Sequence, residues 1–307
     1  MKKYTLWVAA LALAAVSCGP GTSTRDDRMT VTVTIPPFAW FLEQIGGDDF
    51  KVNVLLPPGA DHHIWEPLPA QISSLSGSAA FIMNGQLSFE HAWMDRFRQV
   101  NPDMKVLDLS GNIEMIGHED IEDGGEDHEG HGHSEGVGED GHAHGGPDPH
   151  YWMSPVAARI MARDIRDFLA GINPASAEKY DANFSAVSTK IAEVDSTVRA
   201  ALGDDPHRTV LIYHPALAYM GRDYGFEQVS FEDEGKSPSP ARMKELIDVA
   251  REKGIKIIFI QAEYDVRNAQ SLSRETGARL VVINPMNPEW PEAVIEVARA
   301  MGSDIRH

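Results

Sequence analysis

Short apolar runs alternate with longer amphipathic stretches from about Thr30 to the end of the chain. Runs rich in Val and Ile between turn residues predict strands, and stretches with apolar residues three and four apart predict helices. The predicted strands are 30–35, 51–56, 79–83, 105–109, 208–213, 255–260 and 279–283. The predicted helices are 36–47, 87–100, 155–171, 240–253, 266–276 and 291–302. This alternation favours an α/β protein with mostly parallel sheets and helices on both faces.

The stretch 175–202 contains neither Gly nor Pro and carries an apolar stripe along one helix face. The stripe consists of Tyr180, Phe184, Val187, Ile191, Val194, Val198 and Leu202. Such a long helix between two α/β segments predicts a spine that joins two lobes. The order strand, proline, helix, glycine, strand occurs in both 31–56 and 209–231, so we expect the lobes to be similar. The predicted units are an N-terminal α/β lobe (29–172), a linking helix (173–203) and a C-terminal α/β lobe (204–307).

The N-terminus has the pattern of an export signal, with Lys2 and Lys3 before an apolar stretch and small residues before Cys18. Cys18 is the only cysteine, so an intrachain disulfide and a cysteine-based zinc site are excluded. The letters "AVSC" resemble the lipobox of a bacterial lipoprotein. We therefore expect a signal peptide over 1–17, lipidation at Cys18 and a flexible tether over 18–28. The product would be exported and lipid-anchored to a bacterial membrane, facing the periplasm or the cell exterior.

The net charge of −19 argues against nucleic-acid binding, but the charge is uneven. Between Glu119 and Asp140 lie ten carboxylates and no basic residue, within a His-, Asp-, Glu- and Gly-rich insert over 117–146. The insert has low hydrophobicity and no period, so we expect it to be disordered. The histidines of the insert are His118, His128, His131, His133, His142 and His144.

Three histidines lie where predicted strands and helices meet. His63 follows the strand 51–56, His214 directly follows the strand 208–213, and His150 comes just before a predicted helix. Ligands of open α/β sheets bind beyond the carboxyl ends of the strands. Two lobes on a spine could therefore bring these imidazoles together in a cleft, where three neutral nitrogens suit Zn²⁺.

The other histidines have simpler interpretations. A single histidine in a loop or on a helix is more often an ordinary polar residue than a ligand, and we interpret His91, His207 and His307 in this way. His62 is a rival of its neighbour His63, because adjacent side chains of an extended segment point in opposite directions.

Several motifs together resemble the ZnuA-like substrate-binding proteins of metal-ion ABC transporters. They are "LLPPGADHHIWEPLP", "AAFIMNGQLSFEHAWMDRF", "DPHYWMSP", "LIYHPALAYMGRDYGFEQ" and "SLSRETGARLVVINPM". The resemblance implies two α/β lobes joined by one long helix, with a metal ion between them. It assigns His63, His150 and His214 as ligands. Histidine at the third position is typical of zinc-type members, whereas manganese-type members carry a carboxylate there, so Zn²⁺ is expected rather than Mn²⁺.

The chain departs from the resemblance at the fourth ligand. Many members place an Asp after the last core strand, but this chain has Asn284. An amide oxygen is a weaker ligand, so water, Glu263 or Gln261 could complete the site instead.

The resemblance also implies partners and a use for the insert. The chain would be a monomer that captures zinc and delivers it to an ABC permease and its ATPase, and it would not be an enzyme. The insert would be an accessory metal-collecting loop rather than a merely solvating linker, because free imidazoles bind zinc transiently and carboxylates concentrate cations.

Two other functions use the same residues. A zinc hydrolase would combine three histidines with a general base such as Glu66 or Glu263. A surface adhesin or zinc-buffering lipoprotein without a transporter would need the same site as a transport protein.

Overall fold

The computed structural model describes residues 28–117, 146–203, 208–232 and 237–302. Its first sheet has the order β2-β1-β3-β4, and every pairing is parallel. The strands are β1 (Met29–Val33), β2 (Phe50–Val54), β3 (Ser78–Met83) and β4 (Lys105–Asp108). The central strands β1 and β3 are mostly buried. β3 is apolar after its first residue, as a strand covered on both faces requires, whereas β1 alternates threonine with valine.

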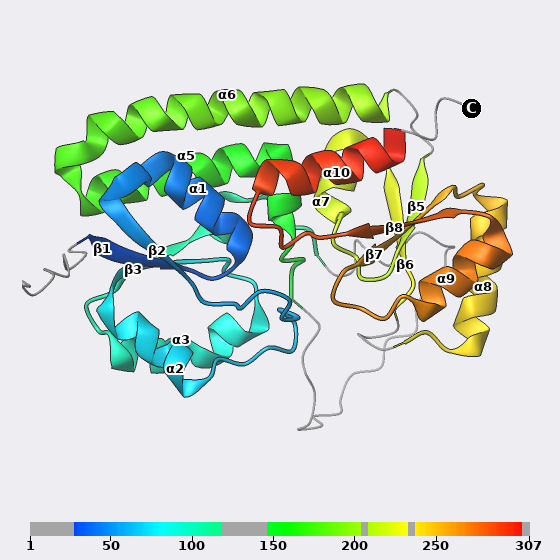
Figure 1. Ribbon diagram of the computed structural model, residues 1–307, viewed down its shortest axis with the longest axis horizontal. Coiled ribbons are helices and arrows are strands. Elements are labelled where there is room, and N and C mark those ends of the chain that lie inside the picture. The colour runs from blue at the N-terminus through cyan, green and yellow to red at the C-terminus, as the bar shows by residue number, and fades with distance from the viewer. Residues whose placement is uncertain (1–27, 118–145, 204–207, 233–236, 303–307) are drawn as a thin grey trace, which may run out of the picture.

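The helices of the first lobe begin with strong local signals. They are α1 (Pro36–Gly46), α2 (Pro69–Ser74), α3 (Ser88–Val100) and α5 (Pro155–Ile172). Three of them start at a proline, whose missing N–H costs nothing in the first turn. The side chain of Ser154 also accepts a hydrogen bond from Val156 N and so caps α5. Figure 1 shows α1 and α5 on one side of the sheet and α2 and α3 on the other.

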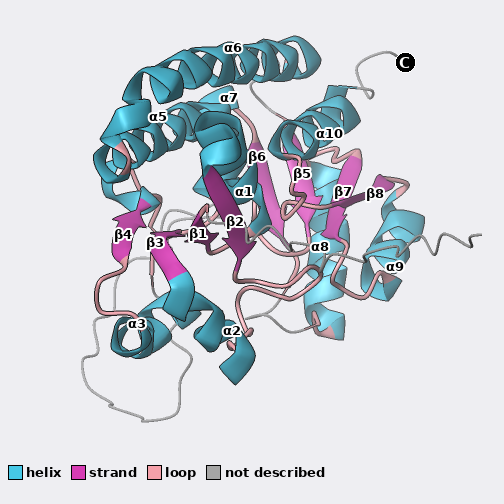
Figure 2. Cartoon of the chain, turned by 60° about the vertical axis from the view of Figure 1, so that its left-hand side comes forward, coloured by secondary structure: helices cyan, strands magenta, loops and turns pink. Residues whose placement is uncertain are grey.

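The second lobe repeats this plan. Its sheet has the order β6-β5-β7-β8, again with parallel pairings only. The strands are β5 (Thr209–Ile212), β6 (Glu227–Ser230), β7 (Ile257–Gln261) and β8 (Arg279–Ile283). The helices are α7 (Ala218–Tyr224), α8 (Pro240–Glu252), α9 (Arg267–Thr276) and α10 (Trp290–Gly302). The two sheets lie beside each other in Figure 2, so the predicted fold class of two similar parallel α/β lobes is confirmed.

The predicted spine is α6 (Ala177–Leu202), which runs along both lobes (Figure 1). It packs against α1, α5 and α10. The predicted stripe is the buried face of this helix, and Phe184 alone of its members is only partly buried. Most polar side chains between the stripe positions are exposed, as an amphipathic helix requires, while Asn183 and Asp195 are partly buried and hydrogen-bond to Ile45 O and Tyr224.

Two buried tryptophans connect the lobes. Trp290 of α10 packs against Trp40 and Phe41 of α1, with ring centroids 5.6 Å and 5.1 Å apart. Its Nε1 donates to the carbonyl of Trp152 at 2.7 Å, and Trp152 Nε1 donates to the carbonyl of Pro285 at 3.0 Å. One apolar core therefore runs through the first lobe, the spine and α10.

Some predictions differ from the structure or lie outside it. The short helix α2 was not predicted, because six residues are too few to establish a helical period. The signal peptide, Cys18, nearly all of the tether and the insert histidines lie outside the described residues, as do His207 and His307. Within the part of the chain that is described, no helix has the length and apolar composition needed to cross a membrane.

Replacing Trp290 by Ala should destabilise the protein by about 3–5 kcal/mol, because it removes a fully buried ring and an interlobe hydrogen bond. Urea unfolding followed by circular dichroism measures this change. The control is Val282→Ala at a half-exposed position, which should change stability by less than about 0.5 kcal/mol. Equal stability of the two variants would show that the tryptophan contact does not hold the lobes.

Candidate metal centre

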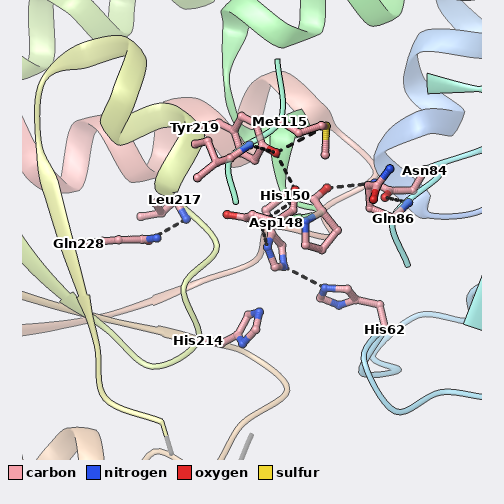
Figure 3. A network of polar contacts seen from close by, with 12 residues as sticks. His62, Asn84, Gln86, Met115, Asp148, His150, His214, Leu217, Tyr219 and Gln228 are labelled. Atoms are coloured by element: carbon pink, nitrogen blue, oxygen red, sulfur yellow. Dashed lines mark hydrogen bonds and ion pairs between the residues drawn. The ribbon is translucent and has the colours of Figure 1, made fainter. Parts of the chain in front are cut away.

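Four imidazoles from three loops meet between the lobes. His62, His63, His150 and His214 each offer one nitrogen, and these four nitrogens all lie within 4.8 Å of one another. The ring centroids of His63 and His214 are 4.2 Å apart, and those of His150 and His214 are 4.9 Å apart. Figure 3 shows His62, His150 and His214 directed toward a common point from separate segments. The structure thus brings together all three predicted ligands and adds a fourth histidine.

The loop after β2 presents two neighbouring histidines because it forms a helical turn. The carbonyl of Asp61 accepts hydrogen bonds from Ile64 N and Trp65 N, and Asp61 Oδ1 accepts one from His63 N at 2.9 Å. Successive side chains of a helical turn diverge by about 100°, not by the 180° of a strand. The expectation that only one of His62 and His63 faces the site is therefore wrong.

His150 is fixed by the aspartate two residues before it. Asp148 Oδ1 accepts from His150 Nδ1 at 2.6 Å and from His150 N at 2.8 Å. The proton is thereby held on Nδ1, and the lone pair of Nε2 faces the other imidazoles. The second lobe supports this turn, because Tyr219 of α7 donates its hydroxyl to the Asp148 carbonyl at 2.7 Å (Figure 3).

His214 is held in the same way from the second lobe. Its Nδ1 lies 2.8 Å from Glu232 Oε1, just beyond β6. Gln261, at the end of β7, donates to the His214 carbonyl at 2.7 Å and so positions the backbone of this histidine. His214 Nε2 is buried and has no hydrogen-bond partner among the described residues. An aimed, unpartnered nitrogen is the feature expected of a ligand atom.

The surroundings keep the buried imidazoles neutral. Burial lowers the pKa of His62 well below its usual value, and the neighbouring His150 and His214 lower it further. Burial also lowers the pKa of His150, although Asp148 acts in the opposite direction. Neutral imidazoles at neutral pH carry the lone pairs that bind a metal ion. The carboxylates of Asp148 and Glu232, one hydrogen bond away, supply the negative charge that balances a divalent cation.

The residues that the sequence offered as a fourth metal ligand are placed less favourably for binding a metal ion than the four histidines. Asn284 is exposed, and its Oδ1 accepts from Met286 N at 3.0 Å. Gln261 binds the backbone of His214. Glu263 is half-buried and does not belong to the group of converging residues. Burial and the charge of Asp61 raise the pKa of Glu263, and His214 partly opposes this rise. His91 is exposed on α3, away from the group.

This set of donor atoms fits one class of metal ion. Neutral imidazoles are preferred by zinc and other borderline transition metals, whereas magnesium, calcium and manganese prefer oxygen. The site combines imidazoles from both lobes with carboxylates hydrogen-bonded to two of them. Two parallel α/β lobes on a helical spine, with these histidines converging between them, define a bilobal protein with a candidate metal centre.

The chain belongs to the family described as zinc-uptake complex component A, periplasmic (ZnuA), whose model matches residues 31–301. This confirms the resemblance found in the motifs. Among solved structures, a crystal structure of ZnuA is 30% identical, with a TM-score of 0.78, and the match covers 90% of this chain and 99% of that one.

Relatives from two bacteria carry related names. The zinc-binding lipoprotein AdcA of Streptococcus pneumoniae is 29% identical over 290 residues, which are 93% of this chain but 56% of AdcA. The chain therefore spans about half the length of this relative. The high-affinity zinc uptake system protein ZnuA of Bacillus subtilis is 26% identical over 286 residues, or 91% of this chain and 86% of that protein. The Mn²⁺ complex of FpvC from Pseudomonas aeruginosa, at 20% identity and a TM-score of 0.72 over 91% of this chain and 98% of that one, shares the fold.

Asp148→Asn should weaken zinc binding by about 10–100-fold, because a neutral amide holds His150 less firmly and removes one balancing charge. Competition with a chromophoric chelator measures the affinity. Asp164→Asn is the matched control, since Asp164 is also buried but bonds to Asn112 on another part of the lobe. The role given to Asp148 is wrong if the two variants bind zinc equally well.

Proposed function

We propose that this protein captures Zn²⁺ between its lobes through His63, His150 and His214 and delivers it to an ABC permease driven by an ATPase. The observation that carries the proposal is the convergence of four imidazoles from both lobes, two of them, His62 and His150, buried with lowered pKa values. The names of AdcA, a zinc-binding lipoprotein, and of the Bacillus ZnuA, a zinc uptake protein, support the same cargo.

Zinc is favoured over manganese by the donor atoms. The converging group consists of imidazole nitrogens, with the nearby carboxylates of Asp148 and Glu232 bonded to ring nitrogens of His150 and His214. Mn²⁺ prefers carboxylate, carbonyl and water oxygens. The manganese-bound neighbour shares the fold at low identity and gives no reason to change the cargo.

A hydrolase is less well supported than a transport protein. Hydrolysis at zinc needs an open coordination position and a general base beside it. Glu66 is exposed, and Glu263 is not part of the converging group. His62 and His150 are almost fully buried, so little room is left for a substrate beside the ion. A receptor for a bare ion needs no such room.

The remaining parts of the proposal rest on the sequence. The chain would be an exported monomer, anchored by lipid at Cys18 and facing the periplasm or cell exterior. The name of AdcA as a lipoprotein supports the anchor. A C-terminal lobe over 204–307 and an N-terminal lobe over 29–172 would each supply ligands, and the His-rich insert would be an accessory metal-collecting loop.

Replacing His63, His150 or His214 by Ala should each lower the zinc affinity by more than about 100-fold, because each change removes one nitrogen bound directly to the ion. Titration against a chromophoric chelator reads out the change. His91→Ala, at an exposed position of α3, should bind as the unaltered protein does. Tight zinc binding by the His214→Ala protein would overturn the assignment of a zinc site between the lobes.

Deleting residues 118–146 should leave one tight zinc site and remove weak ones. The residues flanking the insert are already joined, since Asp148 N donates to the Ile116 carbonyl at 2.9 Å. The deletion therefore connects Gly117 to Pro147 without moving His150. Calorimetry on both forms counts the sites, and the weak ones should also disappear below about pH 6.5, where free imidazole takes up a proton. Loss of the tight site with the insert would contradict the proposal.

A further inference from the structure

We propose that His62 is the fourth protein ligand, so that the metal ion is held by four imidazoles and by no carboxylate. This inference rests on the proposed zinc site and adds its coordination. It assigns the open position to His62 in place of water, Glu263 or Asn284.

The geometry of His62 agrees with a ligand. Its Nε2 lies 3.0 Å from Nε2 of His150, as the dashed line in Figure 3 marks. Two ligand nitrogens at 2.0–2.1 Å from a tetrahedral zinc ion are separated by about 3.3 Å. The pair is therefore already close to one edge of a zinc tetrahedron. His63 and His214 contribute the other two nitrogens, within 4.8 Å of these.

A hydrogen bond between the two rings does not by itself explain why His62 is buried. His150 donates its Nδ1 proton to Asp148, so its Nε2 can only accept, and His62 Nε2 is the donor in the metal-free protein. The other ring nitrogen, His62 Nδ1, is buried with no partner among the described residues. A side chain that is 3% exposed thus makes one ring–ring hydrogen bond. A metal bond at Nε2 would offset this burial, with the ring in its other neutral tautomer: the proton leaves Nε2 and Nδ1 carries one instead. Until the ion arrives, the hydrogen bond to His150 keeps the ring close to ligand distance.

The charges favour a neutral fourth ligand. Four imidazoles leave the two positive charges of the ion uncompensated by its ligands. Asp148 and Glu232 provide two negative charges through His150 and His214, at 2.6 Å and 2.8 Å from the ring nitrogens. The two positive charges of the ion are then balanced. Glu263 as a further ligand would add a third carboxylate and leave the site with an excess negative charge.

Four nitrogen ligands also set the selectivity. A closed tetrahedron of imidazoles leaves no position for water and suits Zn²⁺, whereas Mn²⁺ requires more ligands and prefers oxygen. His62 would therefore determine specificity as well as affinity. Its replacement by a residue that cannot bind zinc should narrow the difference between zinc and manganese affinity.

Two variants of the full-length chain test this role. His62→Gln keeps a donor for His150 Nε2 but offers only a weak amide ligand. His62→Cys, made together with Cys18→Ala, places a single thiol at the position. His91→Gln on the exposed face of α3 is the control. Each protein is loaded with half an equivalent of Zn²⁺ or Co²⁺ so that the tightest site fills first, and thermal unfolding checks that the variants are folded.

The expected result is a loss of zinc affinity of about 100-fold or more in His62→Gln. Loss of a residue that only hydrogen-bonds to a metal ligand already costs about 10–100-fold in affinity, and loss of a ligand should cost at least as much. Its Co²⁺ complex should lose the intense visible absorption of a four-coordinate site. The cysteine variant should bind zinc tightly and show a thiolate-to-cobalt charge-transfer band, which requires direct contact between sulfur and metal. His91→Gln should match the unaltered protein.

The outcomes separate this inference from the proposed function. If His62→Gln retains full affinity and the cysteine variant shows no charge-transfer band, His62 is not a ligand, while loss of binding in His63→Ala still supports the zinc site. If the unaltered protein itself shows no tight zinc binding, both proposals fail. The charge-transfer band also decides the question should His62→Gln prove unstable.

Discussion

The fixed relation between the two lobes is the constraint on which the metal centre depends. Trp152 follows His150 by two residues, and its indole N–H bonds to Pro285 beyond β8, while Trp290 bonds back to the carbonyl of Trp152. Buried N–H groups must find partners, so these two bonds select one arrangement of the segments. The spine and α10 then bury the remaining apolar surface between the lobes. Imidazoles that belong to different lobes can therefore lie within one bond length of a shared ion.

The site itself balances opposing effects. Burial disfavours the protonated form of His62 and His150, so their lone pairs are free at neutral pH. The same burial raises the free energy of an isolated metal cation in the site. Asp148 and Glu232 resolve this conflict, since each orients an imidazole and adds a negative charge behind it. Because the rings are held before an ion arrives, binding requires little further ordering, and such preorganisation favours high affinity. A site of this kind is suited to collecting a scarce ion.

Regular elements could be predicted because their signals are local. The strands are short apolar runs between turn residues, and the spine stripe from Tyr180 to Leu202 repeats at helical spacing over many turns. The predicted strand 51–56 begins one residue late, and α2 was missed because it is too short to display a period. His63, His150 and His214 became candidates because each lies beside the end of a strand or the start of a helix, where open α/β sheets bind their ligands. Position alone did not single them out, and the motifs that resemble ZnuA-like proteins assigned them as ligands.

The sequence by itself determined the two-lobed α/β fold and the spine, because strand and helix patterns depend on neighbouring residues. Its motifs also indicated three of the histidines that converge. Only the tertiary structure decided that His62 joins them, since the Asp61 turn sets the direction of two adjacent side chains and His150 approaches from 88 positions away. It also decided which polar groups are already engaged, as Gln261 is with the His214 backbone and Asn284 with Met286. Such contacts join residues that are distant in the chain, and no local pattern records which distant partner a side chain will meet.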